Sequence, residues 1–286
     1  MKNLLKSLYI SIYISLLCVV SIHTILGLYS TGLNSVWSGI AISIWPVLLF
    51  FIMLFAKPVA RTSANLNVLV VLAVIGALLA LYLSQDDLQD VYAFAYGSGL
   101  GITGLLLYIF WYSRLGRKPN TALALGHQLP EFKLYTSAGN TWASSDLSQH
   151  PALFLFFRGN WCPLCMAQIK EVAASYQALD KLGISVFLVS PQPEKFTKAL
   201  AKKFKVNFHF MIDKENQAAG ILGIDAKHGT PKGMEALGYD SDTVLPTAIL
   251  TDQNGLILFT DQTDNYRVRP EPETFLRVFT DHALIN

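Results

Sequence analysis

Four long apolar runs without a charged side chain occupy the first 113 residues of the chain. Each is close to the roughly 20 residues that a helix needs to cross the hydrocarbon core of a bilayer. Backbone polar groups cannot stay unpaired in lipid, so such runs fold as helices. We therefore predict an α-helical membrane bundle of four transmembrane helices over residues 1–118. The four runs are Leu8–Leu28, Ser35–Ala56, Leu66–Leu83 and Val91–Ser113.

Small and polar residues inside these runs are expected to serve helix packing. Gly97, Gly101 and Gly104 share one face of the last run, where small residues let helices approach closely. His23 is the only histidine in a run. We interpret it as a hydrogen-bond partner between helices rather than as a proton or haem ligand. Cys18 is expected to be a small apolar side chain.

Basic residues that flank the runs predict the orientation. All seven Lys and Arg of residues 1–118 fall on one side of an alternating topology. The positive-inside rule places this side, and with it both termini, in the cytoplasm. We therefore expect an integral protein of the bacterial inner membrane, with residues 119–286 as a cytoplasmic domain. The seven residues are Lys2, Lys6, Lys57, Arg61, Arg114, Arg117 and Lys118.

Residues 119–286 carry fifteen Lys and Arg against seventeen Asp and Glu. A nucleic-acid-binding domain needs a basic stripe, so we expect no nucleic-acid partner. The strand Ala152–Phe157, a helix to about Leu182 and the strand Ile184–Ser190 predict a parallel βαβ unit within a three-layer α/β domain. The other predicted elements are hairpins over Leu129–Leu147 and over Leu245–Leu250 with Leu256–Phe259, a strand over Phe208–Ile212, and helices over Pro193–Phe204, Asn216–Leu222 and Pro272–Leu284.

The chemistry is expected at Cys162 and Cys165, which follow the strand Ala152–Phe157 and open the next helix. A helix N-terminus offers free N–H groups and the positive end of a dipole, and both stabilise a thiolate. We therefore predict that Cys162 is the attacking thiolate, more exposed and more acidic than Cys165. Cys165, one turn further along, would attack a mixed disulfide at Cys162 and release the partner. Trp161 would shield one side of the pair.

Three other interpretations of the cysteine pair stay open: half of a zinc site, a purely structural disulfide, and a sensing module without turnover. A zinc site wants four ligands. The third cysteine, Cys18, lies in an apolar run, and neither His209 nor His228 has ligand spacing with the pair. We therefore expect no metal, and no cofactor beyond the dithiol itself. The redox interpretation is favoured because a strand, a Trp-Cys-x-x-Cys and a helix in succession are typical of it.

Residues 225–243 are expected to form a loop, because they contain four glycines or prolines and charges of both signs. A loop of this length without secondary structure is uncommon in a compact domain. It is either a flap over the cysteine pair or an ordinary surface insertion, and the sequence favours neither.

The stretch Trp161–Cys165 after a strand, with Pro246 opening a later hairpin, resembles the thioredoxin fold. In that family the matching proline is cis and packs against the cysteine pair. Its neighbours' backbone is then free to pair with an extended substrate. The resemblance therefore implies that Trp161 and Pro246 shape a docking surface.

Residues 125–284 are more closely similar to the peroxiredoxin-like redoxins related to alkyl hydroperoxide reductase and thiol-specific antioxidant proteins. This resemblance implies thiol–disulfide exchange, or reduction of hydroperoxides through a sulfenic acid at Cys162 that Cys165 resolves. It also implies an arginine near the thiolate, for which Arg158, Arg267 and Arg269 are candidates. Arg158 is preferred because it is four residues from Cys162. The matching stretches are Phe157–Cys165, Val189–Gln192 and Tyr266–Pro272.

The chain departs from true peroxiredoxins at two positions. Those proteins place a proline seven residues, and a threonine or serine three residues, before the peroxidatic cysteine. Here Leu155 and Gly159 stand at these positions. The sequence therefore predicts a membrane-anchored thiol–disulfide oxidoreductase with a protein thiol or disulfide as partner. A thiol-dependent peroxidase with a hydroperoxide substrate is the alternative.

Overall fold

The computed structural model describes residues 2–118, 120–147, 150–204 and 206–285. Pro119, the first residue after the predicted membrane region, lies outside the described residues. The chain divides into two compact units. One holds Leu8–Pro58 and Thr62–Arg114, and the other holds the rest of the described residues. Each unit is described by itself below.

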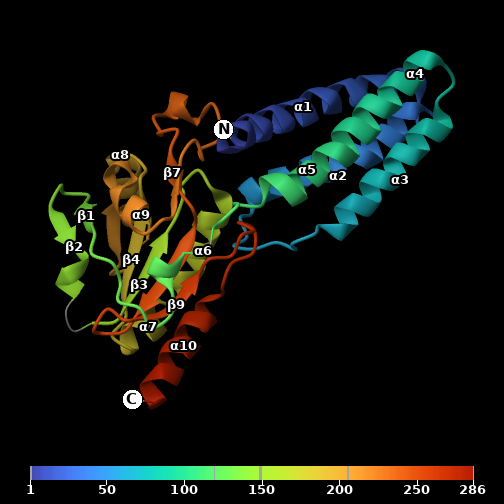
Figure 1. The fold of residues 1–286 in the computed structure, drawn as a ribbon. Helices are drawn as coiled ribbons and strands as arrows, with labels where there is room; N and C mark the ends of the chain where they lie inside the picture. The colour runs from blue at the N-terminus through green and yellow to red at the C-terminus, as the bar shows by residue number, and fades with distance from the viewer. Residues whose placement is uncertain (1, 119, 148–149, 205, 286) are drawn as a thin grey trace. The chain divides into compact units, whose positions relative to one another are not determined.

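The first unit is helical (Figure 1), and helices form in all four apolar runs. Among the described residues, three helical stretches are long and apolar enough to cross a membrane: Lys2–Thr31, Val36–Ala56 and Asp87–Tyr112. The remaining helix is apolar but has 17 residues. At about 1.5 Å per residue it is shorter than the roughly 30 Å hydrocarbon core. The expected four membrane-spanning helices are thus three candidate spans and one shorter apolar helix.

The helices of this unit have the following bounds. They are α1 (Lys2–Thr31), α2 (Val36–Ala56), α3 (Asn67–Leu83), α4 (Asp87–Tyr92) and α5 (Leu105–Leu107), with π-helical turns at Ala93–Gly104 and Tyr108–Tyr112 that continue α4 and α5.

The predicted small-residue face of the last run is a site of close packing. A Cβ at Gly97 would lie 3.2 Å from a backbone atom of α3, and one at Gly101 would overlap the Ser43 hydroxyl. Ser43 in α2 donates a hydrogen bond to the Gly97 carbonyl at 3.1 Å. The His23 ring nitrogen lies 3.2 Å from the Tyr96 hydroxyl, which joins α1 to the last run as expected.

The second unit is built on a seven-stranded sheet with the order β2-β1-β5-β4-β3-β8-β9. Strand β4 is parallel to both β3 and β5, while β8 is antiparallel to both β3 and β9. The predicted parallel βαβ unit and the final hairpin are therefore confirmed. The strands are β1 (Lys133–Thr136), β2 (Thr141–Ala143), β3 (Ala152–Phe156), β4 (Ser185–Ser190), β5 (His209–Ile212), β8 (Thr247–Thr251) and β9 (Ile257–Asp261), and a separate ladder pairs β6 (Asp225–Ala226) with β7 (Thr243–Val244).

The helices of the second unit are close to their predicted places. The predicted cysteine helix is interrupted, because Ser175 leaves the helical region with φ −90° and ψ 8°. The helices are α6 (Pro163–Ala174), α7 (Tyr176–Lys181), α8 (Glu194–Lys203), α9 (Gln217–Ile221) and α10 (Pro272–Ile285), with 3-10 turns at Thr121–Leu123, Ser144–Leu147, Lys214–Asn216 and Met234–Leu237.

The central strands are buried on both faces, which explains their near-continuous apolar sequences. Phe154 of β3 stacks on Phe187 of β4 with ring centroids 4.9 Å apart, inside the main apolar cluster. At the carboxyl end of β3, Phe156 pairs with Thr247 of β8. The loop that follows β3 and the residues that precede β8 therefore emerge at the same edge of the sheet.

Candidate active site

The two cysteines lie where β3 passes into α6, as predicted. Cys162 is the N-cap residue, with φ −88° and ψ 109°, and Pro163 is the first helical residue. Cys162 and Cys165 are free thiols whose Sγ atoms are 2.9 Å apart, within reach of a sulfur–sulfur hydrogen bond. Among the described residues, no group of three or more His, Cys, Asp or Glu side chains is placed to hold a metal ion.

Cys162 was predicted to be more exposed than Cys165, but the structure buries both thiols almost equally. The exposed fraction of Cys162 is 2%, and that of Cys165 is 0%. In the loop that precedes the pair, the Trp161 side chain is half-buried, and the Arg158 guanidinium lies 4.7 Å from its ring centroid. Reaction of the buried thiols therefore requires a local opening of the structure.

A buried cation stands beside Cys165. The Arg269 side chain is 6% exposed, and its Nη2 lies 3.5 Å from Cys165 Sγ. Its Nη1 donates to Gln168 Oε1 at 2.9 Å, and its Nε donates to the Tyr266 carbonyl at 3.0 Å. These contacts use separate nitrogens of the planar guanidinium and fix its orientation. The positive charge is thus held on the second cysteine of the pair.

This placement decides which thiol is acidic. Burial opposes ionisation of Cys165, but the hydrogen bond from the Cys162 thiol, the Arg269 charge and the Arg158 backbone N–H together lower its pKa to about 5. The hydrogen bond to Cys165, together with burial, raises the pKa of Cys162 well above its ordinary value. The predicted order of acidity is therefore reversed. Two sulfurs this close share one negative charge, and the nearest cation draws it to Cys165.

Arg158, the arginine preferred from the sequence, also acts on the pair, though less strongly than Arg269. Its backbone N–H helps to lower the pKa of Cys165, and its charge favours ionisation of both thiols. The Arg158 guanidinium donates a hydrogen bond to the Gly229 carbonyl and lies over the rings of Trp161 and Tyr266. Arg267 is fully buried, with an exposed fraction of 0%.

Pro246 directly precedes β8 and so lies at the sheet edge from which the cysteine loop emerges. The described residues contain no cis peptide bond, so the cis proline implied by the resemblance is not found. The Arg117 guanidinium donates to the Pro246 carbonyl and to Thr247 Oγ1, the latter at 3.1 Å. Burial outweighs the nearby Asp261 and lowers the pKa of Arg117 to about 10. From the sequence, Arg117 was used only to predict the membrane orientation. Its contacts could not be predicted, because its partners are about 130 residues away.

The missing peroxiredoxin hydroxyl at Gly159 has a structural reason. Gly159 has φ +147°, a conformation that side chains with a Cβ rarely adopt. A Cβ there would lie 2.6 Å from Trp161 Nε1. The loop therefore has no room for threonine or serine while Trp161 keeps its position.

Two buried glutamines complete the site and were not predicted. Gln168 holds Arg269, and it follows Cys165 by three residues, the spacing of neighbours on a helix face. Gln192 Oε1 accepts the Asn160 backbone N–H at 2.8 Å, and its Nε2 donates to Thr197 Oγ1 at 3.1 Å. Gln192 belongs to one of the stretches that matched the redoxins, so the resemblance contained a signal for it.

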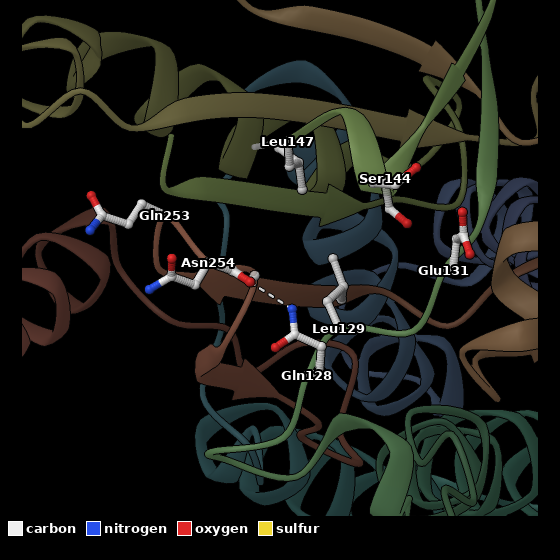
Figure 2. A pocket seen from close by; sticks show the side chains of 9 residues that line it. Gln128, Leu129, Glu131, Ser144, Leu147, Gln253 and Asn254 are labelled. Atoms are coloured by element: carbon white, nitrogen blue, oxygen red, sulfur yellow. Dashed lines mark hydrogen bonds between the residues drawn. The ribbon is translucent and has the colours of Figure 1, made fainter. Parts of the chain in front are cut away.

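A pocket of ≈600 Å³ lies elsewhere in this unit (Figure 2). Gln128 on one side of it donates from Nε2 to the Asn254 carbonyl at 2.6 Å. The pocket is at the opposite end of the sheet from the cysteines, because Thr251 before its turn pairs with Ala152 at the start of β3. It is therefore separate from the redox site. Its lining residues are Gln128, Leu129, Glu131, Ser144, Ser145, Leu147, Gln253, Asn254 and Gly255.

Comparison with known proteins identifies the family that this unit resembles. Residues 125–260 match the AhpC/TSA family. The thiol-disulfide oxidoreductase ResA of Geobacillus thermodenitrificans is 25% identical over 138 residues, which are 48% of this chain and 68% of ResA. The chloroplastic peroxiredoxin Q of Sedum lineare is 27% identical over 121 residues, which are 42% of this chain and 65% of that protein.

Among solved structures, AhpC of Enterococcus faecalis is similar, with a TM-score of 0.45 and 18% identity, covering 56% of this chain and 93% of that chain. The distant sequence relatives thus include proteins named as thiol-disulfide oxidoreductases and others named as peroxiredoxins. Residues 125–260 are a redoxin domain of the AhpC/TSA family, carried by a chain that also contains a region of apolar helices.

Proposed function

We propose that this protein is a membrane-anchored thiol–disulfide oxidoreductase that works through the dithiol of Cys162 and Cys165. The observation that carries the proposal is the arrangement of three groups. The two sulfurs are 2.9 Å apart, and Arg269 is clamped on Cys165. Such a pair closes to a disulfide with little movement, and its thiolate is the nucleophilic form.

The first half of the reaction makes a mixed disulfide. At rest the pair holds one negative charge, which Arg269 draws to Cys165. Cys162 is the sulfur nearer the loop, so it meets the substrate first. Its proton passes across the sulfur–sulfur hydrogen bond to Cys165, and Cys162 attacks one sulfur of the substrate disulfide. The substrate S–S bond breaks, and the leaving thiolate takes a proton from water.

The second half releases the substrate. Cys165 gives its proton to water, favoured by the Arg269 charge, and attacks Cys162 Sγ in the mixed disulfide, whose S–S bond breaks. The second substrate sulfur leaves as a thiolate and takes a proton from water, and the pair becomes a disulfide after giving two electrons to the substrate. A thiol or dithiol donor must then reduce the pair before the next cycle.

A peroxidase is the second candidate. In that reaction a thiolate attacks a hydroperoxide, becomes a sulfenic acid and releases water or an alcohol, after which the other cysteine closes the disulfide with loss of water. The acidic Cys165 beside a cation favours this chemistry. The Gly159 position, which has no room for a hydroxyl side chain, favours disulfide exchange. A sensor or metal module that does not turn over is the third candidate.

The proposal predicts multiple turnover with a protein disulfide. With excess dithiol as donor, the full-length protein in detergent should reduce the disulfides of insulin, and the reduced protein should react more slowly with hydrogen peroxide in stopped flow. The Cys18→Ser variant, which keeps the pair, should behave as the wild type. Faster reaction with peroxide would establish the peroxidase instead. Absence of turnover with both substrates would leave a sensor.

We also propose that the helical region spans the membrane four times and keeps both termini in the cytoplasm. All seven basic residues of the region then lie on the cytoplasmic side. The 17-residue α3 is short for a span, which local thinning of the bilayer accommodates at modest cost. If α3 did not cross, the three longer helices would place the termini on opposite sides.

Fusions of alkaline phosphatase, which is active only outside the cytoplasm, test this topology. A fusion after Asn286 should be inactive, because four spans return the chain to the cytoplasm. A fusion after Leu83, behind three predicted spans, should be active and serves as the matched control. The reverse pattern would mean that the cysteine pair faces outward, either because α3 does not cross or because the four helices cross in the opposite orientation. A cytoplasmic pair would rest as a dithiol and donate electrons.

A further inference from the structure

The segment 227–243 joins β6 to β7 and is held together by its own hydrogen bonds. Its ends are held together by the β6–β7 pairing, in which Ala226 lies opposite Thr243. Inside the segment, the Thr230 N–H donates to the Ser241 carbonyl at 3.0 Å, and the His228 N–H donates to Asp242 Oδ1 at 2.8 Å. The two legs are therefore joined over several residues, and at the tip the Tyr239 N–H donates to the Met234 carbonyl at 3.4 Å.

This segment touches the loop that precedes Cys162 at three points. At its base, Thr243 Oγ1 donates to the Arg158 carbonyl at 2.8 Å, and the Arg158 guanidinium donates to the Gly229 carbonyl. Beyond its tip, the Tyr239 hydroxyl donates to Asn160 Oδ1. Asn160 is two residues before Cys162, so the Tyr239 contact is the one nearest this cysteine along the chain.

Tyr239 also makes a second contact, with helix α8. Its ring stacks on Phe196 of α8 with centroids 4.6 Å apart and an interplanar angle of 6°. One hydrogen bond and one ring stack are modest interactions that can open and close on the time scale of loop motion. The contacts at the base, by contrast, involve the strand ladder and a buried threonine.

The burial of Cys162 limits which substrates can reach its sulfur. Cys162 is 2% exposed, so a folded protein cannot bring its disulfide to the sulfur while the loop is held. A small molecule needs only a side-chain movement. We propose that Tyr239 is a specificity-determining residue: its contacts with Asn160 and Phe196 close the segment 227–243 over the site, and they must open for protein disulfides but not for small reactants. This inference rests on the proposed function and adds which substrates the site admits.

The test compares two maleimides that share a reactive group and differ in size. The full-length protein in a Cys18→Ser background, which leaves only the pair, is reduced and treated with N-ethylmaleimide or with a maleimide linked to polyethylene glycol. Tyr239→Phe removes the hydroxyl and keeps the ring. It should raise the rate with the large reagent about fivefold, the value of one lost hydrogen bond, and leave the small reagent unchanged. Tyr239→Ala should raise the large-reagent rate further.

Tyr176→Phe is the matched control, because the Tyr176 hydroxyl also donates to a side-chain oxygen, Asp180 Oδ1 at 3.2 Å, but on α7. It should leave the ratio of the two rates at the wild-type value. An unchanged ratio in both Tyr239 variants, with folding confirmed by thermal unfolding, would overturn the proposal, as would an equal rise with both reagents. Alkylation needs no turnover. A changed ratio in a protein that reduces no disulfide would therefore refute the proposed function and not the role of Tyr239.

Discussion

Replacing Cys165 with serine is expected to stop turnover and to accumulate mixed disulfides between Cys162 and substrate proteins. The variant keeps the sulfur nearer the loop and loses the thiol that lies 2.9 Å away and resolves the mixed disulfide. Turnover should fall to the uncatalysed background. Non-reducing electrophoresis should show a protein-sized adduct that disappears on reduction, and mass spectrometry should locate it at Cys162.

Cys162→Ser should also lose all turnover, but without trapping substrate, because Cys165 is fully buried. Cys18→Ser is the control and should keep both activity and the absence of adducts. Two results would contradict the assignment of roles. Full turnover by Cys165→Ser would show that a single cysteine suffices. Trapping by Cys162→Ser through Cys165 would show that the more acidic thiol is also the one that attacks the substrate.

The position of the redox pair could be predicted from the sequence because its determinants are local. An apolar strand, two cysteines with Pro163 between them and a helical pattern are contiguous, and the Met166 N–H donates to the carbonyl of the N-cap residue Cys162 at 3.1 Å. The parallel pairing of β3 with β4 followed in the same way from a strand, a helix and a strand in succession. In the first unit, the spacing of Gly97 and Gly101 anticipated close helix contact.

The acidity of the pair could not be predicted, because its main determinants are remote in the sequence. Arg269 is 104 residues from Cys165, and no local pattern shows which of several arginines will reach it. The helix-dipole argument favours Cys162 and is sound for an isolated helix. A guanidinium at 3.5 Å from the other sulfur outweighs it, since direct charge contact in a buried site is the stronger interaction.

The burial of Cys162 has the same kind of origin. Tyr239 and Gly229 lie about 70 residues or more beyond the loop that they contact. Their segment has loop composition, and composition alone does not distinguish a covering segment from a surface insertion. The Arg117 contacts with Pro246 and Thr247 are also long-range. In each case the residue type is known from the sequence, but its contact partner is known only once the chain has folded.

Arg269→Met is expected to move the pH dependence of thiol reactivity upward by several pH units. In the wild type the Cys165 pKa is lowered to about 5, so the thiolate is present above that pH and lost below it. Without the cation, burial pushes the pKa of Cys165 up toward the ordinary thiol value of about 8.5, while the Cys162 hydrogen bond and Arg158 still favour the thiolate. At that ordinary value the thiolate fraction at pH 7 would be about 3%, so resolution of the mixed disulfide should slow by up to about 30-fold.

Stability should respond with a matching sign. A thiol whose folded pKa is lowered binds fewer protons when folded than when unfolded, so it adds stability above its ordinary pKa and loses that contribution as the pH falls through about 5. In Arg269→Met this rise in stability between about pH 5 and 9 should flatten. The variant also leaves Gln168 Oε1 without its donor, at a cost of about 1–3 kcal/mol.

The measurement is the rate of alkylation of the reduced pair by N-ethylmaleimide against pH, with the thiolate ultraviolet absorbance as a second readout. Arg269→Lys keeps the charge and loses the fixed guanidinium geometry, so its midpoint should lie between those of the wild type and Arg269→Met. Arg277→Met removes the same charge from the exposed face of α10 and should leave the midpoint unchanged. If Arg269→Met keeps the wild-type midpoint while folded, the charge on Cys165 does not depend on Arg269. The helix N-terminus would then be the main source of acidity, and Cys162 would regain its predicted place as the resting thiolate.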